Sequence, residues 1–199
     1  MKNTTKQQLI KFGAKAMLAK SYHGVGIQEI LTEVGVPKGS FYYYFDSKED
    51  FGVAIIEYYG EQLANIIRGK LLDSTHSPRE RMYEYYLSVR NFYAVNGCGQ
   101  GCLIAKFATE VANLSPHMRD ALKKEFDKWL ELFSACIKEG QILGEINSDL
   151  GPESLAEFLY TSWEGVLIRM QVNQNLAPID NFINYAFDRI IVKNQVEAE

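Results

Sequence analysis

Hydrophobic and polar residues recur with the period of an α-helix along almost the whole chain, and the runs break at glycine, proline or clusters of small polar residues. From residue 78 onward no segment shows the alternation of a β-strand. The pattern predicts an all-α protein of about nine helices. We expect these helices at about residues 5–21, 26–34, 38–45, 48–72, 79–95, 102–112, 116–140, 152–175 and 178–192.

The segment Gly26–Phe45 has the pattern of two short helices joined by a tight turn. Gly35 lies where a left-handed turn residue is needed, because glycine adopts a positive φ without steric cost. Pro37 suits a helix start, and the second helix is expected to bury Phe41 and Phe45. Two short helices joined in this way are typical of a helix-turn-helix. Four apolar residues at helical spacing share one face of the first helix, namely Ile27, Ile30, Leu31 and Val34.

The second of these helices carries the aromatic run Phe41–Phe45 next to lysine and serine. A helix this short cannot bury every ring, so some rings must face solvent or a partner. A tyrosine hydroxyl beside lysine and serine can donate a hydrogen bond to a phosphate oxygen. The alternative is an ordinary helical hairpin that binds no nucleic acid. We predict a DNA-binding surface made of Lys38, Gly39, Ser40, Tyr42, Tyr43, Tyr44 and Lys48.

Lys48 is unusual because it opens a helix whose first turn also contains Glu49 and Asp50. The N-terminal end of a helix carries partial positive charge, which stabilises the two carboxylates but repels an ammonium group. A phosphate partner would explain this lysine, since backbone N–H groups at a helix start also bind anions. The alternative is a lysine that simply faces solvent.

Composition and charge narrow the function classes. A chain of 199 residues with 47% hydrophobic and 23% charged residues is expected to be a soluble globular protein. It has no apolar run long enough for a membrane span and no apolar stretch typical of a secretory signal, so we expect a cytoplasmic protein without a membrane partner. The net charge of −4 argues against a general nucleic-acid coat. The first 50 residues nevertheless sum to +2 and the remainder to −6, as expected for a cationic DNA-binding end.

A glycine-rich break, Asn96–Gly101, precedes a helix expected to begin near Cys102. The dipole at a helix N-terminus stabilises a thiolate, so Cys102 is expected to be accessible and reactive toward oxidants or alkylators. Cys98 is close enough in sequence to resolve a sulfenic acid as a disulfide, and Lys106 lies one turn further on. The alternative is that Cys102 is a small buried residue. The spacing of cysteines and histidines does not fit a metal site, and we expect no metal or cofactor.

The last two expected helices are apolar around much of their circumference. A helix with so wide an apolar face must be covered on two sides. A single helix-turn-helix of this size makes few contacts, and a two-fold dimer that reads a palindrome is the usual remedy. We therefore expect a homodimer bound to a palindromic double-stranded DNA operator.

The run VPKGSFYYYFDSKEDF resembles the recognition helix and following turn of the TetR family of bacterial transcriptional repressors. One departure is Gly26, where the family usually has a threonine that caps the second helix. The resemblance implies a three-helix DNA-binding domain over residues 1–47 and a helical effector-binding and dimerisation domain over residues 48–199. It also implies that the last two helices pair with their copies as a four-helix bundle. The matching residues are Lys38, Gly39, Ser40, Phe41, Tyr42, Tyr43, Tyr44, Phe45 and Lys48.

A second stretch, GCLIAKFATEV followed by LSPHMR, is similar to the subgroup of that family that responds to electrophiles such as N-ethylmaleimide, aldehydes and quinones, or to acrylate. In the electrophile-responsive members the cysteine of the Gly-Cys-Leu motif is the sensor, which corresponds to Cys102. These members also have a lysine near the sensor in the penultimate helix, whereas Arg169 is the only cation in that helix here. Arg169 could hold a ligand carboxylate or could pair with Glu164.

Together these patterns predict a homodimeric repressor that leaves its operator in response to a small-molecule or electrophile inducer. The inducer would modify Cys102 or fill the core between Phe92 and Trp163, and the long helix from Lys48 to Leu72 would carry the change to the DNA-binding helices. Two alternatives from other classes are an all-helical thiol-dependent enzyme that uses Cys102 and a scaffold protein. The repressor is not expected to be an enzyme. It predicts salt-dependent DNA binding, whereas neither alternative does.

Overall fold

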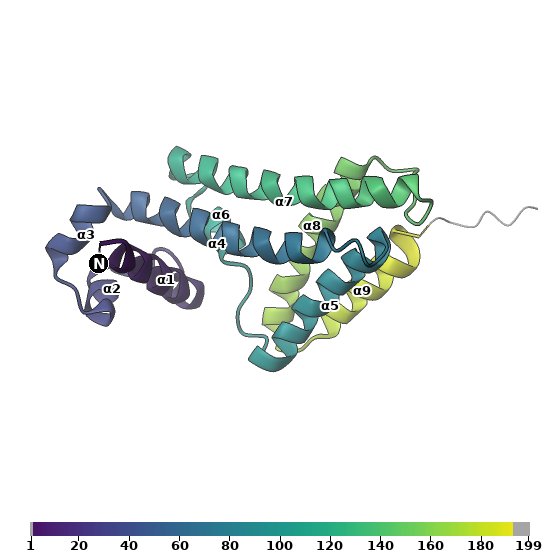
Figure 1. Cartoon of the computed structure of the whole chain (residues 1–199). Helices are drawn as coiled ribbons and strands as arrows, with labels where there is room; N and C mark the ends of the chain where they lie inside the picture. Colours follow the sequence, from purple (N-terminus) through teal and green to yellow (C-terminus); the bar gives the residue numbers. More distant parts are fainter. Residues whose placement is uncertain (1, 193–199) are drawn as a thin grey trace, which may run out of the picture. The chain divides into compact units, whose positions relative to one another are not determined.

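The structure is a computed structural model that describes residues 2–192 of the chain, with side chains from Thr5 onward. Within this part the chain forms nine α-helices, one short π-helix and no strand, which confirms the prediction of an all-α protein (Figure 1). None of these helices is long and apolar enough to cross a membrane. The helices are α1 (Lys2–Lys20), α2 (Ile27–Val34), α3 (Lys38–Tyr44), α4 (Lys48–Leu71), α5 (Pro78–Asn96), α6 (Leu103–Val111), α7 (Pro116–Ile142), α8 (Pro152–Asn173), α9 (Ala177–Tyr185) and the π-helix η1 (Ala186–Ile190).

The chain divides into two compact units, and neither is one continuous stretch of sequence. The first, which we call the head unit, contains the residues up to Leu63 together with Gln100–Phe126. The second, the body unit, contains Ala64–Gly99 together with the residues from Asp127 onward. Helices α4 and α7 each contribute residues to both units. The division into functional domains at residues 1–47 and 48–199 stays a prediction, because compactness alone does not show where binding functions separate.

The turn between α2 and α3 is fixed by backbone geometry and not by side-chain caps. Gly26 precedes α2 in an extended conformation, and no side chain caps the start of that helix. Gly35 has a φ of 71°, in the left-handed region, and Val36 N donates to Leu31 O at 3.1 Å across the turn. Because other L-residues are strained in this conformation, the turn favours glycine. The pair of short helices predicted for Gly26–Phe45 is confirmed.

Three phenylalanines hold α3 against the start of α4. Phe41, Phe45 and Phe51 are 0%, 2% and 0% exposed. The ring centroids of Phe41 and Phe45 lie 5.3 Å apart, and those of Phe45 and Phe51 lie 4.8 Å apart. Full burial of a side chain of this size contributes about 1.5–3 kcal/mol. Gly13 lets α1 approach the cluster, since a Cβ there would lie 2.5 Å from the Phe51 ring.

Helix α6 packs against α1 within the head unit. The ring of Phe107 on α6 meets the ring of Tyr22 edge-on, with centroids 5.5 Å apart. Ser115, just before α7, accepts a hydrogen bond from Met118 N at 3.0 Å and donates one to the Glu49 carboxylate. Within the head unit, α1 and the start of α4 are therefore braced by segments more than 50 residues away in sequence.

In the body unit, α5 and α8 both pack against α9 (Figure 1). Tyr86 of α5 is 1% exposed, and its ring centroid lies 4.9 Å from that of Trp163 and 5.1 Å from that of Phe182. Burial raises the pKa of Tyr86, so its phenol stays protonated. These rings form an aromatic core to which three helices contribute.

The last helix does not run unbroken to Val192 as the sequence pattern predicted. Helix α9 ends at Tyr185, and the next turn is the wider π-helix, in which Ile191 N donates to Ala186 O at 2.8 Å. The wider turn accompanies burial of Ile191, which is 0% exposed, and leaves its carbonyl to accept from Asn147 N at 2.7 Å. A single π-helical turn of this kind cannot be distinguished from an α-helix by apolar spacing alone.

Candidate nucleic-acid interface and sensor segment

The predicted DNA-contacting residues of α3 lie mostly at the surface. Lys38 and Gly39 are exposed, and the side chains of Tyr42 and Tyr43 are 51% and 62% exposed. Ser40 and Tyr44, the remaining two, are half-buried. Ammonium and phenol groups on one short helix supply hydrogen-bond donors of the kind that phosphate oxygens accept. Their contacts with DNA stay a prediction.

Lys48, at the start of α4, is half-buried and has a partner inside the protein. Its Nζ lies 4.7 Å above the centroid of the Tyr22 ring, which is a cation–π contact. Burial lowers the pKa of Lys48, and the negative charge of Glu110 opposes part of that shift. The sequence offered only phosphate or solvent as surroundings for this lysine, and the structure shows a third environment.

Two polar residues of α6 hold the chain that leads from α1 into the DNA-binding pair. Lys106 Nζ donates to Leu18 O at 2.5 Å, near the C-terminal end of α1. Glu110 Oε2 accepts from His23 N at 3.2 Å, in the turn between α1 and α2. The last carbonyls of a helix lack partners within it, so a lysine is a suitable donor there. No sequence signal indicated these pairings, because the partners are 88 and 87 residues apart.

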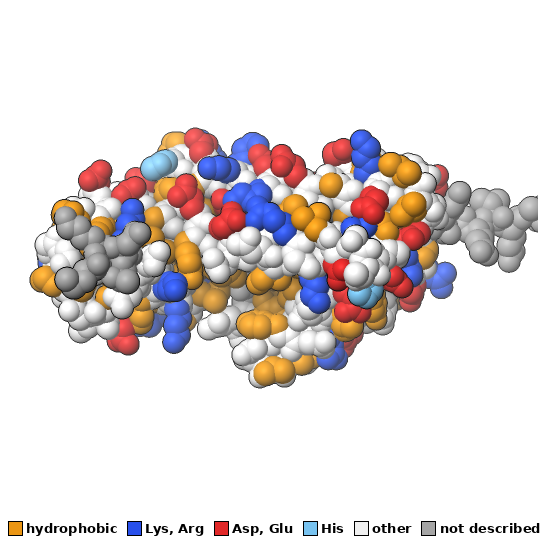
Figure 2. All heavy atoms as spheres, in the orientation of Figure 1, with side chains coloured by type: hydrophobic (Ala, Val, Ile, Leu, Met, Phe, Trp, Pro, Cys, Tyr) orange, Lys and Arg blue, Asp and Glu red, His pale blue; other side chains and the backbone are white. Residues whose placement is uncertain are grey.

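Charged side chains of both signs are interspersed over the face drawn in Figure 2, with apolar side chains between them. One lysine of the first 50 residues, Lys20, pairs with Glu29 at 2.6 Å, and the net charge of +2 already includes both partners. The groups of α3 and the start of α4 are the candidates for recognition of DNA.

Cys102 is the N-cap residue of α6, close to where the sequence placed it. It is 7% exposed, and the next two residues, Leu103 and Ile104, are 0% exposed. The expectation of an accessible thiol is therefore wrong for Cys102 in this conformation, because the apolar residues that follow it draw the helix start into the core. Cys98 is half-buried and belongs to the body unit, whereas Cys102 belongs to the head unit. No disulfide joins cysteines of the described residues.

The third cysteine, Cys136 of α7, is buried in the body unit at 3% exposure. Its Sγ donates to Pro78 O at 3.4 Å. Burial raises the pKa of Cys136 to about 11, against the opposing effect of the Arg81 charge. A thiol with this pKa carries almost no thiolate at neutral pH, so Cys136 is a poor nucleophile.

The other residues predicted to sense an inducer differ in their exposure to solvent. Trp163 is 4% exposed and belongs to the aromatic core, as expected. Phe92 is 58% exposed, so the expectation that it lines the core is wrong, because its position near the end of α5 turns outward. Arg169 is exposed on α8. A role for any of the three in binding an inducer stays a prediction.

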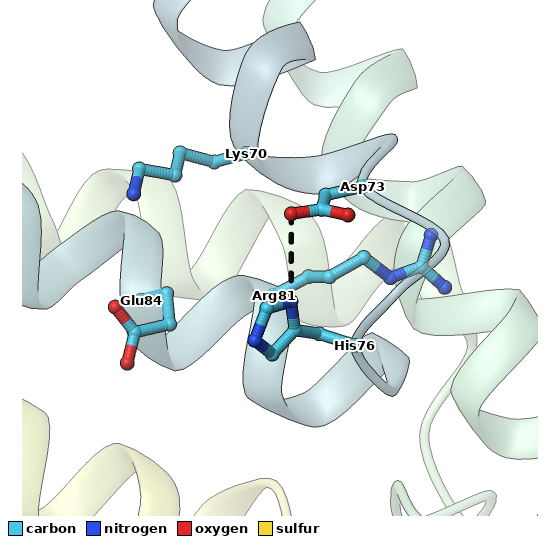
Figure 3. A pocket seen from close by; sticks show the side chains of 5 residues that line it. All are labelled: Lys70, Asp73, His76, Arg81 and Glu84. Atoms are coloured by element: carbon cyan, nitrogen blue, oxygen red, sulfur yellow. Dashed lines mark ion pairs between the residues drawn. The ribbon is translucent and has the colours of Figure 1, made fainter.

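A small cleft of about 80 Å³ lies in the body unit between the end of α4 and the start of α5. Figure 3 shows Lys70 and Glu84 approaching the cleft from the two helices. Asp73 lies beside His76 in the connecting loop, and His76 Nδ1 is 3.4 Å from Asp73 Oδ2. Hydrogen bonds from Thr75 lower the pKa of Asp73. The lining is wholly charged or polar, and it includes none of the residues that the sequence suggested for an inducer. The described residues contain no group of three or more His, Cys, Asp or Glu that could hold a metal ion.

The class of this protein follows from the features of α2 and α3. The two short helices are joined by a left-handed glycine turn, and α3 has buried phenylalanines behind it and lysine and tyrosine on its outward side. The protein is a transcriptional regulator of the helix-turn-helix class. More specifically, the chain belongs to the TetR family of bacterial regulatory proteins. The family model for bacterial regulatory proteins of the tetR family matches residues 9–55, and the model for the tetracyclin repressor-like C-terminal domain matches residues 78–186.

Similarity to known regulators extends over nearly the whole chain. The HTH-type transcriptional repressor DhaR of Mycobacterium sp. (strain GP1) is 36% identical over 94% of this chain and 92% of its own. The transcriptional regulator AcuR of Cereibacter sphaeroides is 34% identical over 88% of this chain and 80% of its own. The HTH-type transcriptional repressor NemR of Escherichia coli (strain K12) is 31% identical over 89% of each chain. A crystal structure of the reduced form of E. coli NemR, 30% identical, has a TM-score of 0.89 and covers 97% of this chain and 100% of that one.

These comparisons confirm the resemblance to the TetR family and to the subgroup that contains AcuR and NemR. The relatives are named as transcriptional regulators, which favours that class over the thiol-dependent enzyme and the scaffold protein.

Proposed function

We propose that this protein is a homodimeric repressor that binds a palindromic double-stranded DNA operator through α3 and the start of α4. An inducer would release it, either an electrophile or oxidant that modifies Cys102 or a small molecule bound in the body unit. The observation that carries the proposal is the outward array of Lys38, Tyr42 and Tyr43 on a short helix held from behind by buried phenylalanines. A regulator that acts on bacterial DNA works in the cytoplasm.

The surface of α3 suits close contact with a duplex. Lys38, Tyr42 and Tyr43 supply donors for phosphate oxygens and base edges. Gly39 is exposed, and a Cβ there would meet nothing within 4 Å, so its missing side chain gives a DNA backbone room to approach. DhaR and NemR, both named as transcriptional repressors, support repression as the outcome of binding.

Exposed apolar residues on α8 and α9 support a dimer through these helices. Phe158, Ile168 and Val172 of α8 are 51%, 55% and 68% exposed, and Tyr185 at the end of α9 is 66% exposed. The α8 residues recur at helical spacing, with exposed Gly165 among them, where a second helix could approach closely. An apolar face of this extent needs a cover, and a second copy would also place two recognition helices about one DNA turn apart.

Helix α6 gives the release step a route inside the head unit. Cys102 caps α6, while Lys106 and Glu110 of the same helix contact the end of α1 and the turn that follows it. An adduct on a buried thiol needs room, so the start of α6 would have to move, and its two polar contacts would move with it. This route adds to the one through α4 that the sequence suggested.

A reversible inducer is the second form of the release step. The aromatic core around Trp163 is the apolar part of the body unit best suited to a small ligand, and exposed Phe92 and Arg169 are candidates for its outer contacts. Arg169 could then hold a ligand carboxylate by bidentate hydrogen bonds.

The test is fluorescence anisotropy on DNA from the region upstream of the gene, with and without N-ethylmaleimide or hydrogen peroxide. We expect tight, salt-sensitive binding that the thiol reagents abolish in the wild type and in Cys98→Ser, but not in Cys102→Ser. Binding that ignores the reagents in every variant would contradict the thiol switch and leave the reversible ligand. An absence of salt-sensitive binding on both the upstream region and random operator libraries would contradict the repressor itself and favour the enzyme or the scaffold.

A further inference from the structure

Lys48 is held within the head unit by groups from two other segments. Its Nζ lies 4.7 Å above the Tyr22 ring, and Tyr22 follows the end of α1. Tyr22 is 8% exposed, and its ring is fixed in turn by the edge-on contact with Phe107 of α6 at 5.5 Å. The negative charge of Glu110, also on α6, opposes part of the burial-induced lowering of the Lys48 pKa. The surroundings of Lys48 therefore depend on where α6 lies.

Glu110 is tied to the same turn by a second contact. Its Oε2 accepts from the backbone N–H of His23 at 3.2 Å, and His23 directly follows Tyr22 in the chain. One short turn thus carries both the ring beneath Lys48 and the N–H group that fixes Glu110. A displacement of α6 would change the ring support and the negative charge near Lys48 together.

We propose that Lys48 has two competing partners, the Tyr22 ring with the Glu110 carboxylate in the DNA-free protein and an operator phosphate in the complex, and that Glu110 is a positioning residue acting through Lys48. The proposal rests on the proposed repressor function. An ammonium group has three N–H donors, so a ring and a phosphate can share it only in part, and we expect the strongly charged phosphate to draw it away from the ring. Operator binding would then displace the internal contact. A movement of α6 that draws Glu110 toward Lys48 would favour release.

The test is a double-mutant cycle on operator affinity. Glu110→Gln keeps an oxygen that can accept from His23 N and removes only the charge, so we expect binding about two- to fivefold tighter. Asp120→Asn, at an exposed acid of α7 in the head unit, removes the same charge elsewhere and should change affinity by less than about 1.5-fold. Lys48→Met should weaken binding, reduce the salt dependence by about one phosphate contact and abolish the gain from Glu110→Gln.

The second readout is the NMR signal of the Lys48 ε-methylene protons. We expect an upfield ring-current shift from Tyr22 in the DNA-free protein and its loss when operator is added. The proposal is overturned if Glu110→Gln tightens binding no more than Asp120→Asn, if the gain persists with Lys48→Met, or if operator binds while the upfield shift stays. A wild type that binds no DNA in a salt-sensitive way would instead overturn the proposed function, and this inference with it.

Discussion

The head and body units are stabilised in different ways. In the head unit, α2 and α3 are eight and seven residues long and have no side-chain cap at either start. Helices this short are not stable alone, so their geometry depends on the buried phenylalanines and on α6. In the body unit, α5 is 19 residues long and begins with a capping box between Ser77 and Glu80. We therefore expect the geometry of α2 and α3 to respond to small displacements of the residues packed against them more than α5 does.

The largest expected effect comes from removing the support behind α3. Phe41→Ala should cost about 3–5 kcal/mol of the free energy of unfolding and abolish operator binding, because removal of a fully buried ring leaves a cavity between α3 and the start of α4. Urea denaturation followed by circular dichroism, together with anisotropy, measures both. The matched change on the outer face, Tyr43→Ala, should alter stability by less than about 0.5 kcal/mol while still weakening operator binding. Equal stability losses in the two variants would show that α3 does not depend on its buried face.

The next effect tests how closed the body unit is. The pKa of Cys136 is about 11 in the folded protein against an ordinary value of 9.0, so folding favours the protonated thiol. The stability that the protonated Cys136 thiol contributes to the free energy of unfolding is fully present below about pH 9. It is lost between about pH 9 and pH 11, and the total loss is about 2–3 kcal/mol. We expect the difference in unfolding free energy between the wild type and Cys136→Ala to fall over this range. Cys98→Ala, at a half-buried cysteine, is the control and should show no such pH dependence; parallel curves for both variants would contradict the closed environment of Cys136.

Two glycines sharpen the comparison at a smaller scale. Gly35→Ala forces a side chain into the left-handed region and should destabilise the protein by about 1–2 kcal/mol, although a Cβ there would meet no neighbour within 4 Å. Gly69→Ala, on an exposed position of α4 in the body unit, should stabilise by about 0.5–1 kcal/mol, because alanine is the better helix former. Thermal denaturation monitored at the helical signal measures the two shifts. Changes of the same sign would mean that the left-handed φ of Gly35 does not strain an alanine at that position.

The smallest effect concerns surface ion pairs, one in each unit. In the body unit, Arg90 Nε lies 2.9 Å from Asp180 Oδ1 and joins α5 to α9. Both partners are partly exposed, so Asp180→Asn should lower the melting temperature only slightly, and the difference should vanish at about 1 M salt. Glu29→Gln, which removes the Lys20 pair in the head unit, should behave in the same way. A large, salt-independent loss in either variant would show that the pair fixes the packing of its helices.

Local patterns in the sequence were sufficient to predict the α2–α3 pair. Gly35 and the spacing of Phe41 and Phe45 act on their immediate neighbours, so each can be interpreted without knowledge of the rest of the chain. The sequence also contains a signal that predicts the first residue of α5 more accurately than apolar spacing does. Ser77 followed by Glu80 is a capping-box pattern, and the helix begins at Pro78, one residue before the expected start.

The features that the sequence did not predict depend on long-range contacts. The helix dipole describes how a thiol at Cys102 would behave, but not that Leu103 and Ile104 would carry it into the core. The placement of Gln100–Phe126 with the DNA-binding helices likewise rests on pairs such as Lys106 with Leu18. A lysine one turn after a cysteine has many possible partners, and spacing does not select among them.

The membership of α6 in the head unit bears on domain exchange between regulators. A junction after residue 47 is the natural place to graft this DNA-binding motif onto a foreign effector domain. Such a chimera would leave behind the α6 residues that hold the turn after α1, namely Lys106, Phe107 and Glu110. The head unit is thus encoded by two separate pieces of the gene, and we expect that both must be transplanted, or must diverge together, for α3 to keep its orientation.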